Sequence, residues 1–354
     1  MQQLVQIRGR GAAQNPKNRF EQAEYVPDLE AVDDDEPGPR TQFLRDHTRG
    51  IISRNDSPDI PFETSVNPYR GCEHGCIYCF ARPTHEYLGF SAGLDFETRI
   101  LVKHEAPELL RKELASPKWT GQPIAMSGVT DPYQPVERRL GITRACLEVL
   151  AEFRNPVAMV TKNHLVTRDI DLLGELAAHQ AAVVNLSVTT LNEKLQRVME
   201  PRASTPARRL EAVRRLAEAG IPVRVLVAPV MPGLTDHEMP AIIAAAAEAG
   251  ATAASYIPLR LPHGLKGLFE DWLQTHFPDR RDKVLNRIRE MRGGKLYDSE
   301  WGTRMRGEGL FADQYEALFG AACRKHGLVR DFPPLSSAGF RRPHDRAGQM
   351  GLFG

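Results

Sequence analysis

The sequence contains few cysteines, no long apolar run and almost no net charge, and each shortage limits what the protein can be. Only 5 of its 354 residues are cysteine, an odd number, so the disulfide framework of a small secreted protein is not expected. No stretch approaches the length of a membrane-spanning helix, and the first residues lack the apolar core of a signal peptide. We therefore expect a cytoplasmic protein that does not enter a membrane. The net charge of +1 argues neither for nor against a nucleic-acid partner.

The remaining composition is that of an ordinary globular protein. Hydrophobic residues make up 42% of the chain and charged residues 26%, as in a domain that buries a sizeable core. A chain of 354 residues is long enough for one large α/β domain with appendages.

Three of the cysteines lie close together, in a segment that we call the cysteine loop (residues 71–80). Cys72, Cys76 and Cys79 have the spacing C-x-x-x-C-x-x-C, and Gly71 and Gly75 allow so short a loop to turn its thiols toward one centre. Thiolate ligands select iron–sulfur clusters, zinc or copper(I). A four-iron cluster takes four ligands, and the loop offers three cysteines. One iron would then be open to a substrate or a cofactor.

A structural zinc site is the competing interpretation of the same loop. It needs a fourth ligand, which His74 or His85 could supply. The protein would then be a non-enzymatic zinc-binding adaptor for nucleic acid or a sliding clamp. The other two cysteines, Cys146 and Cys323, lie in helical patterns and are expected to be small buried residues.

Apolar runs alternate with amphipathic helical patterns along most of the chain. Thr205 before Pro206 predicts the start of one helix, and Thr235 with Glu238 predicts a capping box at another. Short links between strands and helices imply βαβ units and a parallel sheet. Six such units predict an α/β fold, an incomplete (β/α)6 TIM-type barrel. The expected strands are residues 64–67, 124–126, 157–160, 182–186, 223–227 and 253–257.

Polar residues follow several of these strands. Asp131 comes after the second run, Lys162 two residues after the third, and Ser187 at the end of the fourth. Because chemistry in such barrels gathers at the carboxyl ends of the strands, we expect these residues around the cysteine loop.

The cysteine loop, with Tyr78 just before its last cysteine, resembles the signature of radical S-adenosylmethionine (radical SAM) enzymes. The longer context, from Asn67 through the Thr-Asp-Pro-Tyr-Gln-Pro stretch at 130–135, is similar to the branch that contains spore photoproduct lyase. The resemblance covers residues 45–295 and implies the same barrel. It implies a [4Fe–4S] cluster on the three cysteines, S-adenosylmethionine on the open iron, and reductive cleavage to a 5′-deoxyadenosyl radical. An electron donor of the flavodoxin or ferredoxin type is then expected.

The resemblance also suggests roles for individual residues. Tyr78 stands where the superfamily places an aromatic residue against the adenine. Asp131, Lys162 and Ser187 are candidates to bind the amino, carboxylate or ribose groups of S-adenosylmethionine, the alternatives being rim salt bridges and a strand-end turn. The chain departs from spore photoproduct lyase at Ser127, where that enzyme has a hydrogen-donating cysteine. A nucleic-acid lesion or modification is the expected substrate, although the lyase's own chemistry is in doubt.

The ends of the chain predict appendages. Residues 1–45 are polar and are expected to form a disordered tail, followed by the barrel at 46–295 and a helical extension at 296–335. Basic and aromatic residues alternate between 287 and 306, which fits either a nucleic-acid groove or a solvated helix face. Residues 336–354 are expected to be mobile. They end in Gln349, Leu352 and Phe353, which resemble a peptide that docks on sliding clamps.

Overall fold

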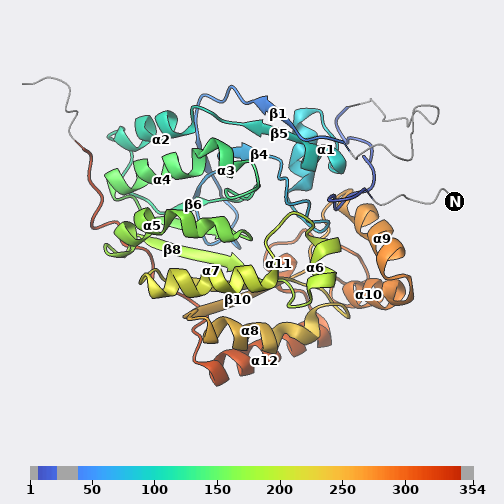
Figure 1. Ribbon diagram of the computed structural model, residues 1–354. Helices are drawn as coiled ribbons and strands as arrows, with labels where there is room; N and C mark the ends of the chain where they lie inside the picture. Colours follow the sequence, from blue (N-terminus) through green and yellow to red (C-terminus); the bar gives the residue numbers. More distant parts are fainter. Residues whose placement is uncertain (1–6, 22–38, 344–354) are drawn as a thin grey trace, which may run out of the picture.

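The computed structural model describes residues 7–21 and 39–343 (Figure 1). Its centre is a sheet of seven strands in the order β10-β9-β8-β7-β6-β3-β2. Six strands are parallel neighbours, and β2 (Ile52–Arg54) pairs antiparallel with β3 at one edge. Because β2 and β10 are the two edges, the sheet is an open, partial barrel. The parallel strands are β3 (Thr64–Val66), β6 (Ile124–Met126), β7 (Val157–Thr161), β8 (Ala182–Ser187), β9 (Val223–Val230) and β10 (Ala253–Pro258). All six predicted strands and the predicted fold class are confirmed.

Helices cover the outer face of this sheet and bury the main core against it (Figure 1). These are α2 (Ala106–Ala115), α4 (Ile142–Phe153), α5 (Ile170–Ala177), α7 (Pro206–Glu218) and α8 (Met239–Glu248). The long α12 (Gly309–His326) packs on α8, while α9 (Leu265–His276) and α10 (Pro278–Glu290) pack on each other beside the cysteine loop. Short elements fill the links: η1 (Arg82–Leu88), α1 (Leu94–Thr98), α3 (Glu137–Leu140), η2 (His164–Asp169), α6 (Glu193–Met199), η3 (Asp236–Glu238) and α11 (Thr303–Arg306).

The two predicted helix starts have different outcomes. Thr205 caps α7, and its side chain accepts a hydrogen bond from the Arg208 amide. The capping box at Thr235 is wrong: this hydroxyl accepts from the Met231 amide instead. The Glu238 carboxylate binds the hydroxyl of Thr190 and the amide of Leu191, beyond the end of β8. Tertiary contacts have replaced the local cap.

The expected disorder of residues 1–45 is wrong for the described parts of that range. Residues 7–21, the N-terminal strap, lie across the outer side of the cysteine loop. Residues Gln42–Arg45 form β1, which pairs with β5 (Arg99–Val102) in a second, three-stranded sheet. The strap has little apolar surface of its own, and its order comes from hydrogen bonds to the barrel.

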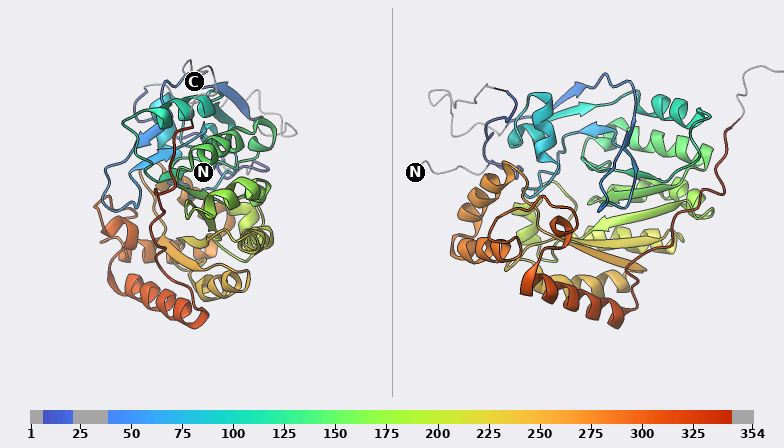
Figure 2. Two further views of the ribbon diagram at one scale, coloured as in Figure 1. Left: turned by 90° about the vertical axis from the view of Figure 1, so that its left-hand side faces the viewer. Right: turned by 180° about the vertical axis from the view of Figure 1, so that it is seen from behind.

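The expected mobility after residue 336 is likewise wrong as far as residue 343. We call residues 327–343 the C-terminal strap. Near its start, Val329 forms a parallel bridge to Ala253 on the open edge of β10. The chain then crosses the side of the barrel where the strands begin (Figure 2, left). The Ser336 amide donates to Gln180 there, and Phe340 packs against Phe153. The clamp-like residues Gln349, Leu352 and Phe353 lie outside the described residues.

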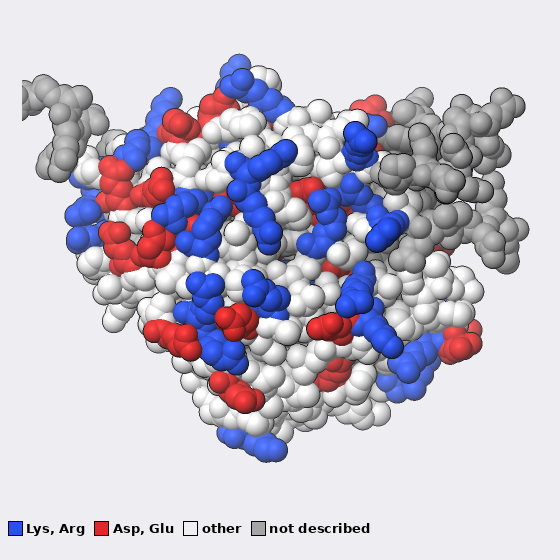
Figure 3. Space-filling model, viewed as in Figure 1, with Lys and Arg blue, Asp and Glu red and all other residues white. Residues whose placement is uncertain are grey.

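Lys and Arg side chains gather over the middle of the face that carries α3 and α7 (Figure 3). Within the described part of the chain, no helix combines the length and the apolar character needed to cross a bilayer. Cys146 and Cys323 are buried in α4 and α12, as predicted.

Candidate functional site

The cysteine loop lies at the carboxyl ends of the parallel strands, between β4 (Tyr69–Arg70) and η1. Gly71 and Gly75 have φ angles of 79° and 67°, which are costly for any other residue. A Cβ atom on Gly75 would lie 2.7 Å from the Glu97 carboxylate. Cys72 and Cys76 are buried and Cys79 is half-buried. The glycines therefore have the role that the spacing predicted.

The three thiols lie close enough together that the charge of one affects the pKa of another. Burial raises the pKa of all three, and Asp131 and the other two cysteines raise the pKa of Cys72 further. Backbone amides oppose this effect at two of them: the His74 amide points to Cys72, and those of Ala81 and Arg82 point to Cys79. Amides directed at sulfur favour the thiolate form that binds metal.

The stretch from 130 to 136 holds the loop from one side. The Thr130 hydroxyl donates to the Gly71 carbonyl over 2.6 Å. The Gln134 side chain accepts from the Glu73 amide over 2.9 Å, and the Val136 amide binds the Glu73 carboxylate over 2.8 Å. This stretch carries part of the family resemblance, and in the fold it is a support for the cysteines.

Asp131 connects the loop to the end of β7. Its carboxylate accepts from the Thr161 hydroxyl at 2.7 Å and the Lys162 amide at 2.8 Å, and it lies 3.3 Å from Nδ1 of His74. Burial alone would raise the pKa of Asp131, but the His74 ring and these hydrogen bonds lower it overall. Both carboxylate oxygens are therefore occupied by protein groups.

A buried ion pair that no sequence pattern predicted lies on the other side of the loop. Glu200, which follows α6, accepts hydrogen bonds from the hydroxyls of Tyr78 and Thr189 and pairs with Arg209 of α7. Lys162 Nζ lies 4.0 Å from Glu200 Oε1 and 5.6 Å from the centre of the Tyr78 ring. Burial opposes ionisation of Glu200, yet Arg209 and Lys162 lower its pKa to about 2.

Tyr78, Lys162 and Ser187 thus meet through residues that were not predicted. Arg209 also donates to the Ser187 carbonyl over 3.1 Å, so its guanidinium joins β8 to the cysteine loop. No local pattern distinguishes Glu200 after a short helix, or Arg209 on an amphipathic one. The Ile77 amide of the cysteine loop also donates to the Met199 carbonyl, next to Glu200, over 3.1 Å.

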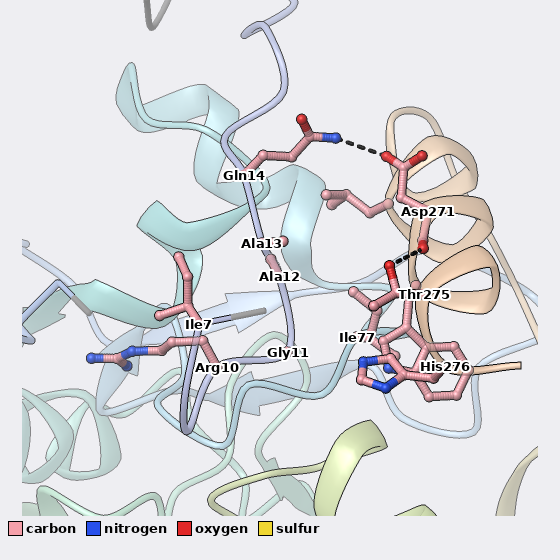
Figure 4. Close-up of a pocket in the computed structure, with 12 residues that line it drawn as sticks. Ile7, Arg10, Gly11, Ala12, Ala13, Gln14, Ile77, Asp271, Thr275 and His276 are labelled. Atoms are coloured by element: carbon pink, nitrogen blue, oxygen red, sulfur yellow. Dashed lines mark hydrogen bonds between the residues drawn. The ribbon is translucent and has the colours of Figure 1, made fainter. Parts of the chain in front are cut away.

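The N-terminal strap closes the outer side of the loop. The amides of Gly11 and Ala12 donate to Glu97 over 3.0 and 2.9 Å, and Glu97 pairs with Arg82. Arg82 Nε in turn donates to the Cys76 carbonyl over 2.9 Å. A narrow cavity remains between the strap and α9, where Gln14 donates to Asp271 (Figure 4).

The donor set fits an iron–sulfur cluster better than a zinc ion. His74 contacts Asp131 and lies 3.1 Å from Asn163, and the His85 ring lies 2.9 Å from the Arg99 carbonyl. Each ring thus uses Nε2 for a protein group, while Nδ1 of each ring is buried without a hydrogen-bond partner. Among the described residues, no three His, Cys, Asp or Glu side chains are grouped tightly enough for a single ion. Thiols at the corners of a cluster lie further apart than ligands of one ion.

The outer rim beside Cys79 carries an aromatic ring and two arginines. Phe80 is half-exposed, and the Arg260 guanidinium lies 5.3 Å from its ring centre. Arg292 donates to the Leu259 carbonyl and lies close enough to Arg260 that their charges repel. Two arginines of the basic stretch between 287 and 306 form ion pairs within the protein: Arg287 pairs with Asp236, and Arg304 pairs with Asp59.

Comparisons with known proteins agree with this geometry. The family model described as the radical SAM superfamily matches residues 66–246. The uncharacterized protein Rv2578c of Mycobacterium tuberculosis is 38% identical over 234 residues, 66% of this chain and 68% of the relative. The uncharacterized protein MJ0683 of Methanocaldococcus jannaschii is 29% identical over 49% of this chain and 62% of its own.

Among solved structures, spore photoproduct lyase complexed with dinucleoside spore photoproduct has the same fold. Its TM-score is 0.59 at 16% identity, and the match covers 82% of each chain. With the family model covering half of the sequence and the partial barrel in place, the chain belongs to the radical SAM superfamily and is a radical SAM enzyme.

Proposed function

We propose that Cys72, Cys76 and Cys79 hold one [4Fe–4S] cluster and leave one iron for S-adenosylmethionine. The observation that carries this proposal is the set of three neighbouring thiols with backbone amides directed at two of them. When bound, such a cluster supplies the electron for reductive cleavage of the S-adenosylmethionine sulfonium. The protein's part is to orient the cofactor and to exclude water.

Lys162 and Ser187 are the residues that we propose to contact S-adenosylmethionine. Lys162 is partly exposed and carries a point charge that suits the cofactor carboxylate. Ser187, at the end of β8, suits a ribose hydroxyl. Tyr78 contributes its backbone and a ring fixed by Glu200, while Asp131 acts as a positioning residue because its oxygens are occupied.

For the substrate we propose a nucleic acid carrying a lesion or a modified base. Phe80 gives a surface on which a base can stack, next to the loop, and Arg260 adds a charge that suits a phosphate. One structure with the same fold is that of spore photoproduct lyase complexed with dinucleoside spore photoproduct. Ser127, whose hydroxyl donates to the Thr130 carbonyl over 2.6 Å, is not a candidate hydrogen donor to a product radical, because a serine O–H bond is far stronger than a thiol S–H bond.

We assign catalysis to residues 46–295 and treat 296–335 as an extension of that unit. A flavodoxin- or ferredoxin-type protein is proposed as the electron donor. A sliding clamp remains the proposed partner of Gln349, Leu352 and Phe353. Pull-down by the full chain and by a Leu352→Ala/Phe353→Ala variant would test it, and equal recovery would reject it.

Anaerobic reconstitution tests the cluster assignment. Wild-type protein should take up iron and sulfide for one cluster, turn brown and form 5′-deoxyadenosine with dithionite. Cys76→Ser should lose both the bound cluster and the product. Cys146→Ser, which changes a buried cysteine on α4, is the matched control and should keep both. Zinc in a colourless protein, or full cofactor cleavage by Cys76→Ser, would overturn the assignment.

Fluorescence anisotropy with a labelled single-stranded oligonucleotide tests the substrate class in the protein without its cofactors. Phe80→Ala with Arg260→Met should weaken binding by about 1–3 kcal/mol, the usual contribution of one stacked base. Tyr87→Ala, an exposed aromatic on η1, is the control and should bind as wild type does. Equal affinity of all three proteins would count against a nucleic-acid substrate at this rim.

A further inference from the structure

Three arginines form a basic patch on the outer side of the barrel: Arg138 of α3 and Arg208 and Arg215 of α7. All three are exposed and lie close enough to His164 to act on its charge. Arg208 Nη2 is 3.2 Å from His164 Nδ1, and Arg215 donates to the Thr167 hydroxyl over 3.2 Å. The patch belongs to the face on which Lys and Arg side chains gather in Figure 3.

The charge of this patch is not neutralised within the described residues. None of its three arginines forms an ion pair with a carboxylate there, whereas the neighbouring Arg168 binds Glu137 and Asp169. Glu211 is the nearby acid, and it pairs with Arg214 over 3.2 Å. Burial first, and then the three arginines, lower the pKa of His164, as expected where the local potential is positive. The patch can therefore attract a polyanion or an acidic protein.

Only a thin layer of side chains separates the patch from the cysteine loop. The His164 amide donates to the Ser204 hydroxyl over 2.9 Å, and the adjacent Asn163 side chain lies 3.1 Å from His74 Nε2. Arg202, two residues before Ser204, pairs with Glu73 over 2.9 Å. Glu73 and His74 stand between Cys72 and Cys76. The patch is thus next to the outer surface of the predicted cluster ligands.

The patch and the proposed substrate site lie on different sides of the barrel wall. Lys162, at the end of β7, turns toward Tyr78 and Glu200, whereas His164 turns outward to α7. A substrate at Phe80 and Arg260 therefore leaves the patch uncovered. Such a separation suits an enzyme that takes electrons from one protein while it holds its substrate elsewhere.

We propose that the basic patch is the docking surface for a small acidic one-electron carrier protein of the flavodoxin class. This inference rests on the proposed function, because it assumes that an electron must reach the cysteine loop. One electron leaves the carrier and is accepted at the loop, so the carrier is oxidised by one electron while no atom is transferred. Charge complementarity guides the encounter and governs its rate more than its final affinity.

The test compares two reductants and two charge-reversal variants of the full chain. Arg138→Glu/Arg208→Glu reverses two of the three charges of the patch, and Arg324→Glu/Lys325→Glu on α12 is the control with the same change in net charge. With reduced flavodoxin at low salt, the patch variant should form 5′-deoxyadenosine about 10-fold more slowly than wild type, a typical cost of lost electrostatic steering. With dithionite, a small reductant that needs no docking, both variants should match wild type.

Direct binding supplies a readout that does not depend on activity. Flavodoxin binding to immobilised, cofactor-free protein should weaken for the patch variant only, and its dependence on salt should become shallower. Unchanged binding, or equal weakening in both variants, would overturn the inference. Weaker oligonucleotide binding with unchanged flavodoxin binding would make the patch a nucleic-acid surface instead. If wild type formed no 5′-deoxyadenosine with dithionite, the proposed function would be rejected. The flavodoxin-binding measurement would still show whether the patch is a docking surface. If charge reversal prevents folding, Arg138→Gln/Arg208→Gln takes its place.

Discussion

The Gly11 amide donates a 3.0 Å hydrogen bond to Glu97 Oε2, although 86 positions separate the two residues. Through Glu97 and Arg82 this bond reaches the Cys76 carbonyl, so the N-terminal strap and the cysteine loop form one hydrogen-bonded unit. A chain segment that its composition marked as disordered is thus part of the structure that holds the cysteine loop.

The strap should affect how firmly the protein holds its cluster. A Cβ atom on Gly11 would lie 1.8 Å from the Gly75 carbonyl oxygen, so Gly11→Ala must displace the strap or the loop. We expect a loss of about 1–3 kcal/mol in unfolding free energy, as in other overpacked sites, and less iron bound after reconstitution. Gly174→Ala on α5, where a Cβ has open space, is the control. Equal iron content in the two variants would show that the strap is dispensable for the loop.

Removing the buried charge of Glu200 should destabilise the whole rim. Glu200→Gln leaves the Arg209 guanidinium buried without its counter-ion, which costs about 3–5 kcal/mol. Denaturant unfolding followed by circular dichroism measures the loss. Glu211→Gln breaks an exposed pair with Arg214 and should change stability by less than about 1 kcal/mol. A loss of similar size in both variants would mean that the buried pair contributes no more to the free energy of unfolding than the exposed pair does.

Much of the barrel was predictable because its strands are short apolar runs that can be recognised within a few consecutive residues. The six parallel strands and the loop glycines follow from such local signals. The contacts that define the site do not. Glu200 and Arg209 are ordinary surface-type residues in sequence, and only the fold brings them behind Tyr78.

The order of the two straps could not be predicted for the same reason. Composition measures what a segment can bury by itself, and residues 7–21 and 327–343 bury little until the barrel offers partners. The contacts of Asp131 with His74 and with the end of β7 are likewise made by residues distant in sequence. Position along the chain predicts where a side chain lies more readily than what it binds.

Lys103 should make stability depend on pH in the alkaline range. Burial, and then Arg70, lower its pKa to about 8 from the usual 10.5, although Asp46 opposes the shift. Between these values the unfolded chain holds more protons than the folded one, so stability rises as pH increases from about 8 to 10.5 and is flat below.

The variant Lys103→Met should therefore be more stable than wild type by about 3 kcal/mol at pH 7, and the difference should vanish near pH 10.5. Chemical unfolding at several pH values would measure this convergence. Lys325→Met, an exposed lysine on α12, should follow the wild-type curve. A constant difference between Lys103→Met and wild type across this range would contradict the assignment.

The C-terminal strap should contribute to stability without touching the rim. Phe340 packs against Phe153, and its ring covers Gly121, where a Cβ would lie 2.7 Å from it. Phe340→Ala should lower the free energy of unfolding by about 1–2 kcal/mol, as expected for a half-buried aromatic residue. Iron uptake should remain at the wild-type level. Reduced iron uptake in this variant would instead link the two ends of the barrel.

Residue 343 leaves the barrel at the end opposite to the cysteine loop, beside the Trp119 carbonyl that Arg342 binds. A partner bound by the chain beyond residue 343 would therefore be attached at the end of the barrel where the strands begin, and the cysteine loop at the other end would remain accessible.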